Sequence, residues 1–254
     1  MDIIEINNLY YKYDDNVIFN NVNLNIKEFS FTTIVGKKGK STLTKILNNK
    51  LDFIGEITIS NLELCKRSKK DLNNIIGVID DIFLCDTVLE EITYQIEYEK
   101  IERRLASLKK IINIDNIINK RIDELSFGEK QIVGFLKIII KNPKIIVIDD
   151  SLSMVDNYIK KRIFRYLKKM ISEKKLTVVY FTNNTEDLLY SDYLIVLDEG
   201  KVLFNSSLKD VLSHEKELNI DIPYVCRLSN KIKYYGLVNK TYYDFRKLVD
   251  DLWK

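Results

Sequence analysis

Hydrophobic and polar residues alternate through the first part of the chain. Isoleucine alternates with polar residues in residues 2–7, and valine, leucine and isoleucine alternate with asparagine in residues 17–26. A period of two residues is typical of strands with one buried face. Residues 14–16, with the sequence Asp-Asp-Asn, favour a turn between the two segments. The pattern therefore predicts a β-rich N-terminal region.

A β-branched strand is predicted at residues 31–35, and it ends at Gly36. A helix is predicted at residues 41–48, because the apolar residues there fall on one helical face. A strand, a glycine loop and a helix in this order form the arrangement that cradles phosphate groups. Two further short strands are predicted at residues 57–59 and 75–79.

The period changes in the middle of the chain. Apolar residues recur at helical spacing from residue 88 to residue 122. Another helix is predicted from about residue 128 to residue 141, and it stops before Pro143. We therefore expect a helical insertion at about residues 83–141.

The second half of the chain returns to strands that alternate with helices. Residues 144–150 contain four consecutive apolar residues, which is typical of a parallel strand buried on both faces. The segments that follow predict a helix at 157–172, a strand at 176–182, a hairpin turn at 198–200 and a helical tail from residue 208. This order predicts an α/β fold.

The composition excludes several classes of protein. Hydrophobic residues make up 46% of the 254 residues and charged residues 30%, which excludes disorder and collagen-like repeats. A net charge of +3 gives no reason to expect a nucleic-acid partner. The chain has one histidine, so His-rich metal sites and a Ser-His-Asp triad are excluded. No apolar run is long enough to span a bilayer, and no signal peptide opens the chain. We expect a soluble cytoplasmic protein or one that docks on a membrane protein.

Four motifs occur in a fixed order. Gly36-Lys37-Lys38-Gly39-Lys40-Ser41-Thr42 follows the strand at 31–35, and Leu125-Ser126-Phe127-Gly128-Glu129-Lys130-Gln131 opens a helix. The apolar strand then ends in Asp149-Asp150, and Ser153-Met154-Val155-Asp156 lies just beyond it. Together these motifs resemble those of the ATP-binding cassette family, over residues 1–212. The resemblance implies a P-loop nucleotide-binding domain with an N-terminal antiparallel β-subdomain and a helical insertion.

The resemblance also implies ATP and Mg²⁺ as cofactors. Lys40 would reach the β- and γ-phosphates, while Ser41 and Asp149 would bind the metal. Tyr13 matches the aromatic residue that stacks on adenine in this family. The full set of residues that we expect to contact nucleotide is Tyr13, Gly36, Lys38, Gly39, Lys40, Ser41, Thr42, Asp81, Ser126 and Gly128.

The segment that begins at Leu125 resembles the signature motif of the family. There the serine hydroxyl and the amides at the helix N-terminus meet the γ-phosphate of ATP that is held by a second subunit. Ser126 and Gly128 match the family motif at the two positions where a small residue and an exposed backbone amide are needed. The spacing from Ser126 to Glu129 also fits an ordinary capping box.

The C-terminal sequence is similar to the tail of the ATPase subunits of energy-coupling factor transporters. The similarity lies in residues 207–212, 218–224 and 227–231. In that subfamily two ATPases pair with each other and with an integral membrane scaffold that carries a vitamin- or metal-specific membrane subunit. The resemblance implies a peripheral protein at the cytoplasmic face of the membrane. Residues 213–254 are expected to form a helical extension and a possible dimerisation segment.

The phosphate loop departs from the family pattern. The family has four residues between the first glycine and the Gly-Lys pair, whereas only Lys37 and Lys38 separate Gly36 from Gly39. A loop shortened by two residues loses amides that should converge on the β-phosphate. Lys37 and Lys38 could supply charge but not this cradle.

Three further departures concern the same nucleotide site. The family glutamine that contacts Mg²⁺ and senses the membrane partner is missing, and Asp81 is the nearest match. Asp150 replaces the glutamate that acts as general base, and a misplacement of about 1 Å can cost ~100-fold in rate. Asn183 replaces the switch histidine and cannot accept a proton as a base. These changes favour an impaired site in this chain, with Asp150 and Asn183 at its catalytic positions.

The leading interpretation is an energising subunit of a membrane importer, paired with a competent second ATPase in a heterodimer. Three alternatives stay open at this point. The chain could be an ordinary hydrolysing ATPase, a scaffold that binds nucleotide poorly or not at all, or a cassette protein that acts on ribosomes or DNA. Tandem cassettes or long coiled coils, typical of the last class, are absent from the sequence.

Overall fold

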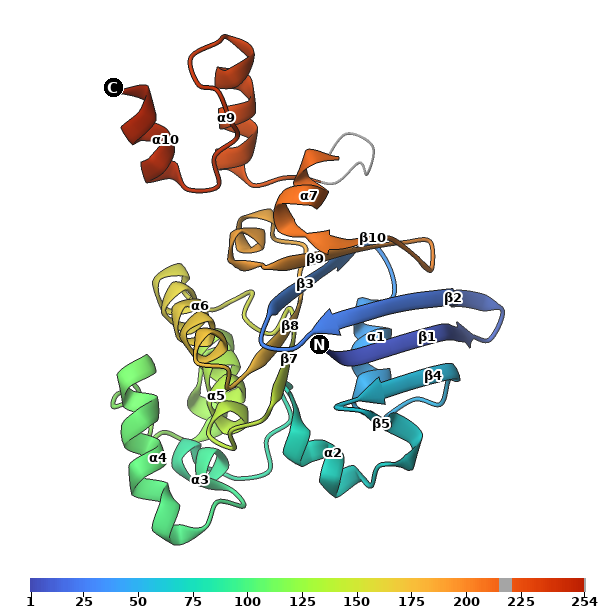
Figure 1. The fold of residues 1–254 in the computed structure, drawn as a ribbon. Coiled ribbons are helices and arrows are strands. Elements are labelled where there is room, and N and C mark those ends of the chain that lie inside the picture. Colours follow the sequence, from blue (N-terminus) through green and yellow to red (C-terminus); the bar gives the residue numbers. More distant parts are fainter. Residues whose placement is uncertain (215–220, 254) are drawn as a thin grey trace.

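The computed structural model describes residues 1–214 and 221–253, which form two β-sheets with helices packed around them (Figure 1). One sheet has four strands in the order β2-β1-β4-β5, and the other has six in the order β10-β9-β3-β8-β7-β6. The α/β fold with an N-terminal antiparallel sheet is therefore confirmed. The sequence motif at 218–224 falls partly on residues 218–220, which lie outside the described residues.

The four-stranded sheet is antiparallel throughout and buries one face. Ile4, Ile6 and Leu9 are almost fully buried, as the alternating pattern predicts. Its strands are β1 (Asp2–Tyr13), β2 (Asn16–Lys27), β4 (Ile54–Ile59) and β5 (Leu62–Glu63).

The six-stranded sheet forms the centre of the molecule. All of its neighbouring strands are parallel except β9 and β10, which form an antiparallel hairpin. The apolar residues of β7 and β8 are buried on both faces, since helices cover both sides. The strands are β3 (Phe31–Gly36), β6 (Ile76–Val78), β7 (Ile145–Asp149), β8 (Thr177–Phe181), β9 (Tyr193–Asp198) and β10 (Lys201–Ser207).

Helices flank the central sheet, and a helical region lies between β6 and β7. That region contains α3 (Val88–Thr93), α4 (Tyr98–Ile111) and α5 (Phe127–Ile139). The other helices that precede the tail are α1 (Lys40–Leu47), α2 (Lys69–Ile75) and α6 (Asn157–Ser172). Helix α2 was not predicted from the sequence, although Ser68 caps it by accepting a hydrogen bond from the Asp71 amide.

The tail beyond β10 is helical, as expected. It consists of α7 (Leu208–Ser213), α9 (Tyr224–Tyr234) and α10 (Phe245–Leu252). A separate hydrophobic cluster joins the tail to β9, with Leu194 and Val196 on the strand and Val225, Cys226 and Leu248 on the helices. Helix α7 lies against β9 and β10 at the edge of the central sheet, and α9 and α10 extend away from the sheet (Figure 1).

A buried ion pair fastens α6 to the segment after β8. The Lys160 ammonium lies 2.9 Å from a carboxylate oxygen of Asp187, and both side chains are buried. The Tyr180 hydroxyl donates to the same carboxylate at 2.7 Å. Asp187 therefore satisfies two buried donors at once.

We expect Asp187→Ala to destabilise the protein by about 3–5 kcal/mol, because it leaves the Lys160 charge buried without a partner. Urea denaturation measures the change in the free energy of unfolding. The matched control is Glu173→Ala, which removes a carboxylate paired with Lys169 and Lys175 on the surface and should cost about 1 kcal/mol or less. If both variants lost the same free energy of unfolding, the buried ion pair between Lys160 and Asp187 would not have the proposed importance for stability.

Candidate nucleotide site

The turn between β3 and α1 is tightly packed. A Cβ atom at Gly36 would lie 2.2 Å from the carbonyl oxygen of Leu197, and one at Gly39 would lie 2.7 Å from the Phe19 ring. Gly39 also has a φ of +94°, which favours glycine. Both glycines are therefore required by local packing. Lys37 and Lys38, between them, are exposed.

The Lys40 side chain folds back over this turn. Its ammonium donates a hydrogen bond to the carbonyl of Gly36 and another, 2.8 Å long, to Oδ1 of Asn183. Burial lowers the pKa of Lys40, and the charges of Asp149 and Asp150 oppose that shift. The structure thus brings together the loop lysine, the two aspartates after β7 and the asparagine after β8.

A cavity of about 730 Å³ opens beside this group. Ser41, Asp81, Asp149 and Asp150 line its polar side, and its other walls include Phe83, Ile122 and Phe127. Asp81 thus lines the same cavity as Ser41 and Asp149, the predicted metal ligands.

The donors in this cavity fit a magnesium ion that is bound together with phosphate. Magnesium is commonly held by one or two carboxylates, with substrate phosphates and waters as the other ligands. Among the described residues, no group of three or more His, Cys, Asp or Glu side chains could hold a metal ion without such help. The Ser41 hydroxyl and the Asp149 carboxylate would hold the ion, which would neutralise phosphate charge.

Asp150 sits at the end of β7 in a left-handed backbone conformation, with a φ of +52°. Its amide donates to the carbonyl of Phe181 at 3.0 Å. Burial and the neighbouring Asp149 charge raise the pKa of Asp150, while Lys160 and Lys40 act in the opposite direction. A carboxylate with a raised pKa has the character of a proton acceptor.

Of the ten residues expected to contact nucleotide, only Ser41 and Asp81 line this cavity. Those outside the lining are the glycines and lysines of the turn, Ser126, Gly128, Tyr13 and Thr42. Tyr13 is 40% exposed at the end of β1, with its ring edge-on to Tyr11 at 4.9 Å. Thr42 is buried in α1. Neither residue lines the cavity that holds Ser41.

The signature segment forms the N-terminus of α5, and the capping box is present. The Ser126 hydroxyl donates to Glu129 at 2.8 Å, and the Glu129 amide returns a bond of 3.3 Å to the hydroxyl. Lys120 adds an ion pair to Glu129 at 3.1 Å. The bonds from the backbone and side chain of Ser126, together with Lys120, lower the pKa of Glu129, so this carboxylate is ionised.

Gly128 is required by packing within the same chain. A Cβ atom there would lie 2.6 Å from the carbonyl oxygen of Met154. Gln131 adds a second link, because its Oε1 accepts a hydrogen bond of 2.9 Å from the Met154 amide. Gln131 belongs to the predicted signature segment, and only the structure shows that it contacts the motif that begins at Ser153. Lys120 was not predicted from the sequence, and only the structure shows its ion pair with Glu129.

Known proteins similar to this chain show its family. A family model described as ABC transporter matches residues 19–153. The energy-coupling factor transporter ATP-binding protein of Mycoplasmopsis synoviae is 29% identical over 248 residues, which cover 91% of this chain and 93% of that protein. The protein of the same description from Oenococcus oeni is 29% identical over 272 residues, covering 100% of this chain and 98% of its own.

Two solved structures are also similar. One is cbiO1 from Clostridium perfringens, described as part of the ABC transporter complex cbiONQ, with a TM-score of 0.75, 25% identity and coverage of 92% of this chain and 97% of its own. The other is a dimeric ATP-binding cassette in a post-hydrolysis state bound to ADP and phosphate, with a TM-score of 0.71, 25% identity and coverage of 81% and 98%.

We expect Asp150→Asn to raise the melting temperature of the nucleotide-free protein at pH 7 by about 1–2 °C, a small effect because the group is only partly removed from solvent, which screens its charge. The pKa of Asp150 is higher in the folded state than its ordinary value of 3.8, so its ionised form destabilises the fold. The difference between the variant and the original protein should therefore shrink as the pH falls towards 3.8.

Thermal scans from pH 4 to pH 8 measure this dependence. Asp15→Asn, in an exposed turn, is the control and should change little across the range. If the increase in melting temperature caused by Asp150→Asn grew as the pH fell, the pKa of Asp150 would not be raised by folding.

Proposed function

Because the chain belongs to the ABC transporter family of ATP-binding proteins, we propose that it is an ATP-binding subunit that energises a membrane importer. One observation carries the proposal: Lys40, Asp149, Asp150 and Asn183, from separate segments, meet at one edge of the central sheet. The relatives named energy-coupling factor transporter ATP-binding proteins support an importer of that type. On the resemblance of the C-terminal sequence alone, we propose vitamin or metal-ion uptake as its role.

The chain's own residues have distinct parts in this proposal. Lys40 and Lys38 would bind phosphate charge, Ser41 and Asp149 would hold the metal, and Asp81 lines the same cavity. Asp150 accepts a proton from the attacking water, and Asn183 donates a hydrogen bond to phosphate. Tyr13 stacks on the adenine, while Gly36, Gly39 and Thr42 shape the loop and the first turn of α1.

We propose further that this chain's own site is the degenerate one of a heterodimer. Support comes from the two-residue turn between Gly36 and Gly39, which offers few amides, and from the bond of Lys40 to the Gly36 carbonyl. Asp150 and Asn183 stand where a longer acid and a base are expected. Ser126 and Gly128 would serve the competent site, which the second ATPase completes.

The partners follow from the same proposal. They are a second ATPase subunit, an integral membrane scaffold and a substrate-binding membrane subunit, with this chain at the cytoplasmic face. None of the helices in residues 1–214 and 221–253 is long and apolar enough to cross a bilayer. We assign the cassette to residues 1–212, with its helical subdomain at about 83–141, and a dimerisation role to residues 213–254. The exposed rings of Tyr234, Tyr235 and Trp253 favour that role.

A second candidate is a scaffold subunit that binds nucleotide poorly or not at all. The observation in its favour is that Lys40 already has two acceptors, the Gly36 carbonyl and Asn183. A phosphate must displace one or both of these acceptors before Lys40 can bind it. Nucleotide binding by the isolated chain distinguishes this candidate from the leading one.

We expect the isolated chain to bind ATP with Mg²⁺ about 10–100-fold more weakly than a cassette with a complete phosphate loop. One missing charge-assisted hydrogen bond of about 1.5–3 kcal/mol accounts for that range. Calorimetric titration measures the affinity. Lys40→Ala should abolish the remaining binding, whereas Lys70→Ala, an exposed lysine on α2, should leave it unchanged. Tight binding that Lys40→Ala removes would show that the short loop suffices.

In a complex reconstituted with a competent partner, we expect Ser126→Arg to lower ATPase activity by ~10²–10³, because it removes a hydrogen-bond donor from the composite site. Lys40→Ala should change turnover little, since it lies in the degenerate site. Steady-state ATPase rates provide the test. An equal collapse in both variants would mean that both sites hydrolyse ATP, and no effect from Ser126→Arg would remove the composite-site argument.

A further inference from the structure

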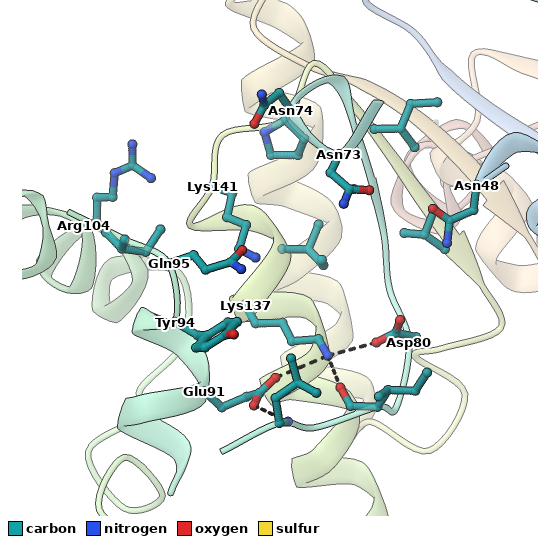
Figure 2. A pocket seen from close by; sticks show the side chains of 18 residues that line it. Asn48, Asn73, Asn74, Asp80, Glu91, Tyr94, Gln95, Arg104, Lys137 and Lys141 are labelled. Carbon is teal, nitrogen blue, oxygen red and sulfur yellow. Dashed lines mark hydrogen bonds and ion pairs between the residues drawn. The ribbon is translucent and has the colours of Figure 1, made fainter. Parts of the chain in front are cut away.

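The loop of residues 80–85 connects the edge strand β6 to helix α3 and has no regular secondary structure. It separates two hollows on the surface. One is the cavity that contains Ser41 and Asp149. The other is a groove of about 510 Å³ between β6 and helices α3, α4 and α5 (Figure 2). Asp80 lines both of them, so the position of this loop shapes the nucleotide side and the groove together.

Glu91 holds the end of the loop that is nearer α3. Its Oε2 accepts hydrogen bonds from the amides of Leu84 at 2.8 Å and Cys85 at 3.0 Å. The side chain is only 3% exposed. A buried carboxylate that accepts two backbone amides is a strong anchor, because both bonds are charge-assisted.

Lys137 of α5 holds the other end. Its ammonium lies 2.9 Å from Oδ1 of Asp80 and 3.5 Å from Oε1 of Glu91, and it also donates to the carbonyl of Ile82. It lies 4.9 Å from the centre of the Phe83 ring. Figure 2 shows the three bonds converging on this one nitrogen at the bottom of the groove.

The residue that precedes the loop contacts the catalytic side directly. The Ser151 hydroxyl, one residue after Asp150, donates to the carbonyl of Ile79 at 3.3 Å. Gly134, one turn before Lys137, allows the close approach, because a Cβ atom there would lie 2.8 Å from the Asp80 carbonyl oxygen. Helix α5, which begins at the signature segment, is therefore packed against the loop that carries Asp81.

We propose that Lys137 and Glu91 are positioning residues that hold the loop of residues 80–85, and with it Asp81, at the metal side of the nucleotide site. The effect on the metal side of the nucleotide site rests on the proposed function. The anchoring of the loop by Lys137 and Glu91 does not depend on that function. Neither residue touches the nucleotide. Each acts by fixing a loop whose side-chain anchors are these two buried charges.

The first measurement is amide hydrogen exchange in the full chain without nucleotide. Glu91→Gln and Lys137→Met should each speed exchange of the Leu84 and Cys85 amides by about 10-fold, since a freed loop opens more often. Lys137→Arg should retain the protection. Lys141→Met is the matched control, because Lys141 lines the same groove one turn further on and forms no ion pair with the loop among the described residues. It should change exchange by less than about 2-fold.

The second measurement is ATP affinity with and without Mg²⁺, by calorimetry on the same variants. Residues that orient metal ligands typically change metal affinity by about 10–100-fold. Lys137→Met should therefore weaken ATP binding about 10-fold when Mg²⁺ is present and by less than about 2-fold when it is absent. Lys137→Arg should bind ATP in the presence of Mg²⁺ about as tightly as the original protein does.

The outcomes separate the two claims. Rapid exchange of residues 80–85 in the original protein, or unchanged exchange in Lys137→Met and Glu91→Gln, overturns the proposal. If the loop exchanges faster in Lys137→Met but the effect of Mg²⁺ on ATP affinity is unchanged, the proposal that the loop positions Asp81 is overturned. If the original protein binds no ATP, the proposed function fails while the exchange data still decide whether these residues hold the loop. Should Lys137→Met not fold, the double variant with Glu91→Gln removes both buried charges and must show the same rapid exchange.

Discussion

The parallel alignment of β3, β7 and β8 is the constraint on which the site depends. Parallel strands end at the same edge of a sheet, so the segments that follow them meet there even though they are far apart in the sequence. Lys40 follows β3, Asp149 and Asp150 end β7, and Asn183 follows β8. The 2.8 Å bond between Lys40 and Asn183 is the direct result of that alignment. Because the strands are buried on both faces, this edge has little freedom to move.

Much of this arrangement could be predicted from the sequence, since it rests on periodicity and on motif order. The helix at residues 157–172 begins and ends as predicted, and the strands at β7 and β8 differ by about a residue at their ends. The strand predicted at 75–79 is shorter, because residue 75 ends helix α2 instead. That helix was missed because its seven residues contain only two large apolar ones, too few to show a period.

The contacts between side chains could not be predicted in the same way. Lys137 looks like an ordinary charge on an amphipathic helix, and Glu91 like a second acid beside a capping glutamate. Their burial at the groove depends on how α3 and α5 pack, which no local pattern encodes. The same holds for Gly128. The motif predicts a glycine there, but packing also requires one, because a Cβ atom at this position would lie 2.6 Å from the carbonyl oxygen of Met154.

The state of Ser126 adds a condition to the proposed composite site. Its hydroxyl has one proton, which it donates to the ionised Glu129. A phosphate held by a second subunit can accept that proton only after the hydroxyl turns away from Glu129, and it must also approach a carboxylate of like charge. Lys120, at 3.1 Å from Glu129, is placed to offset that repulsion. At the N-terminus of α5, the Ser126 hydroxyl therefore already donates its hydrogen bond to Glu129 before any phosphate binds. Binding of the phosphate requires Ser126 to exchange this hydrogen-bond partner for a phosphate oxygen.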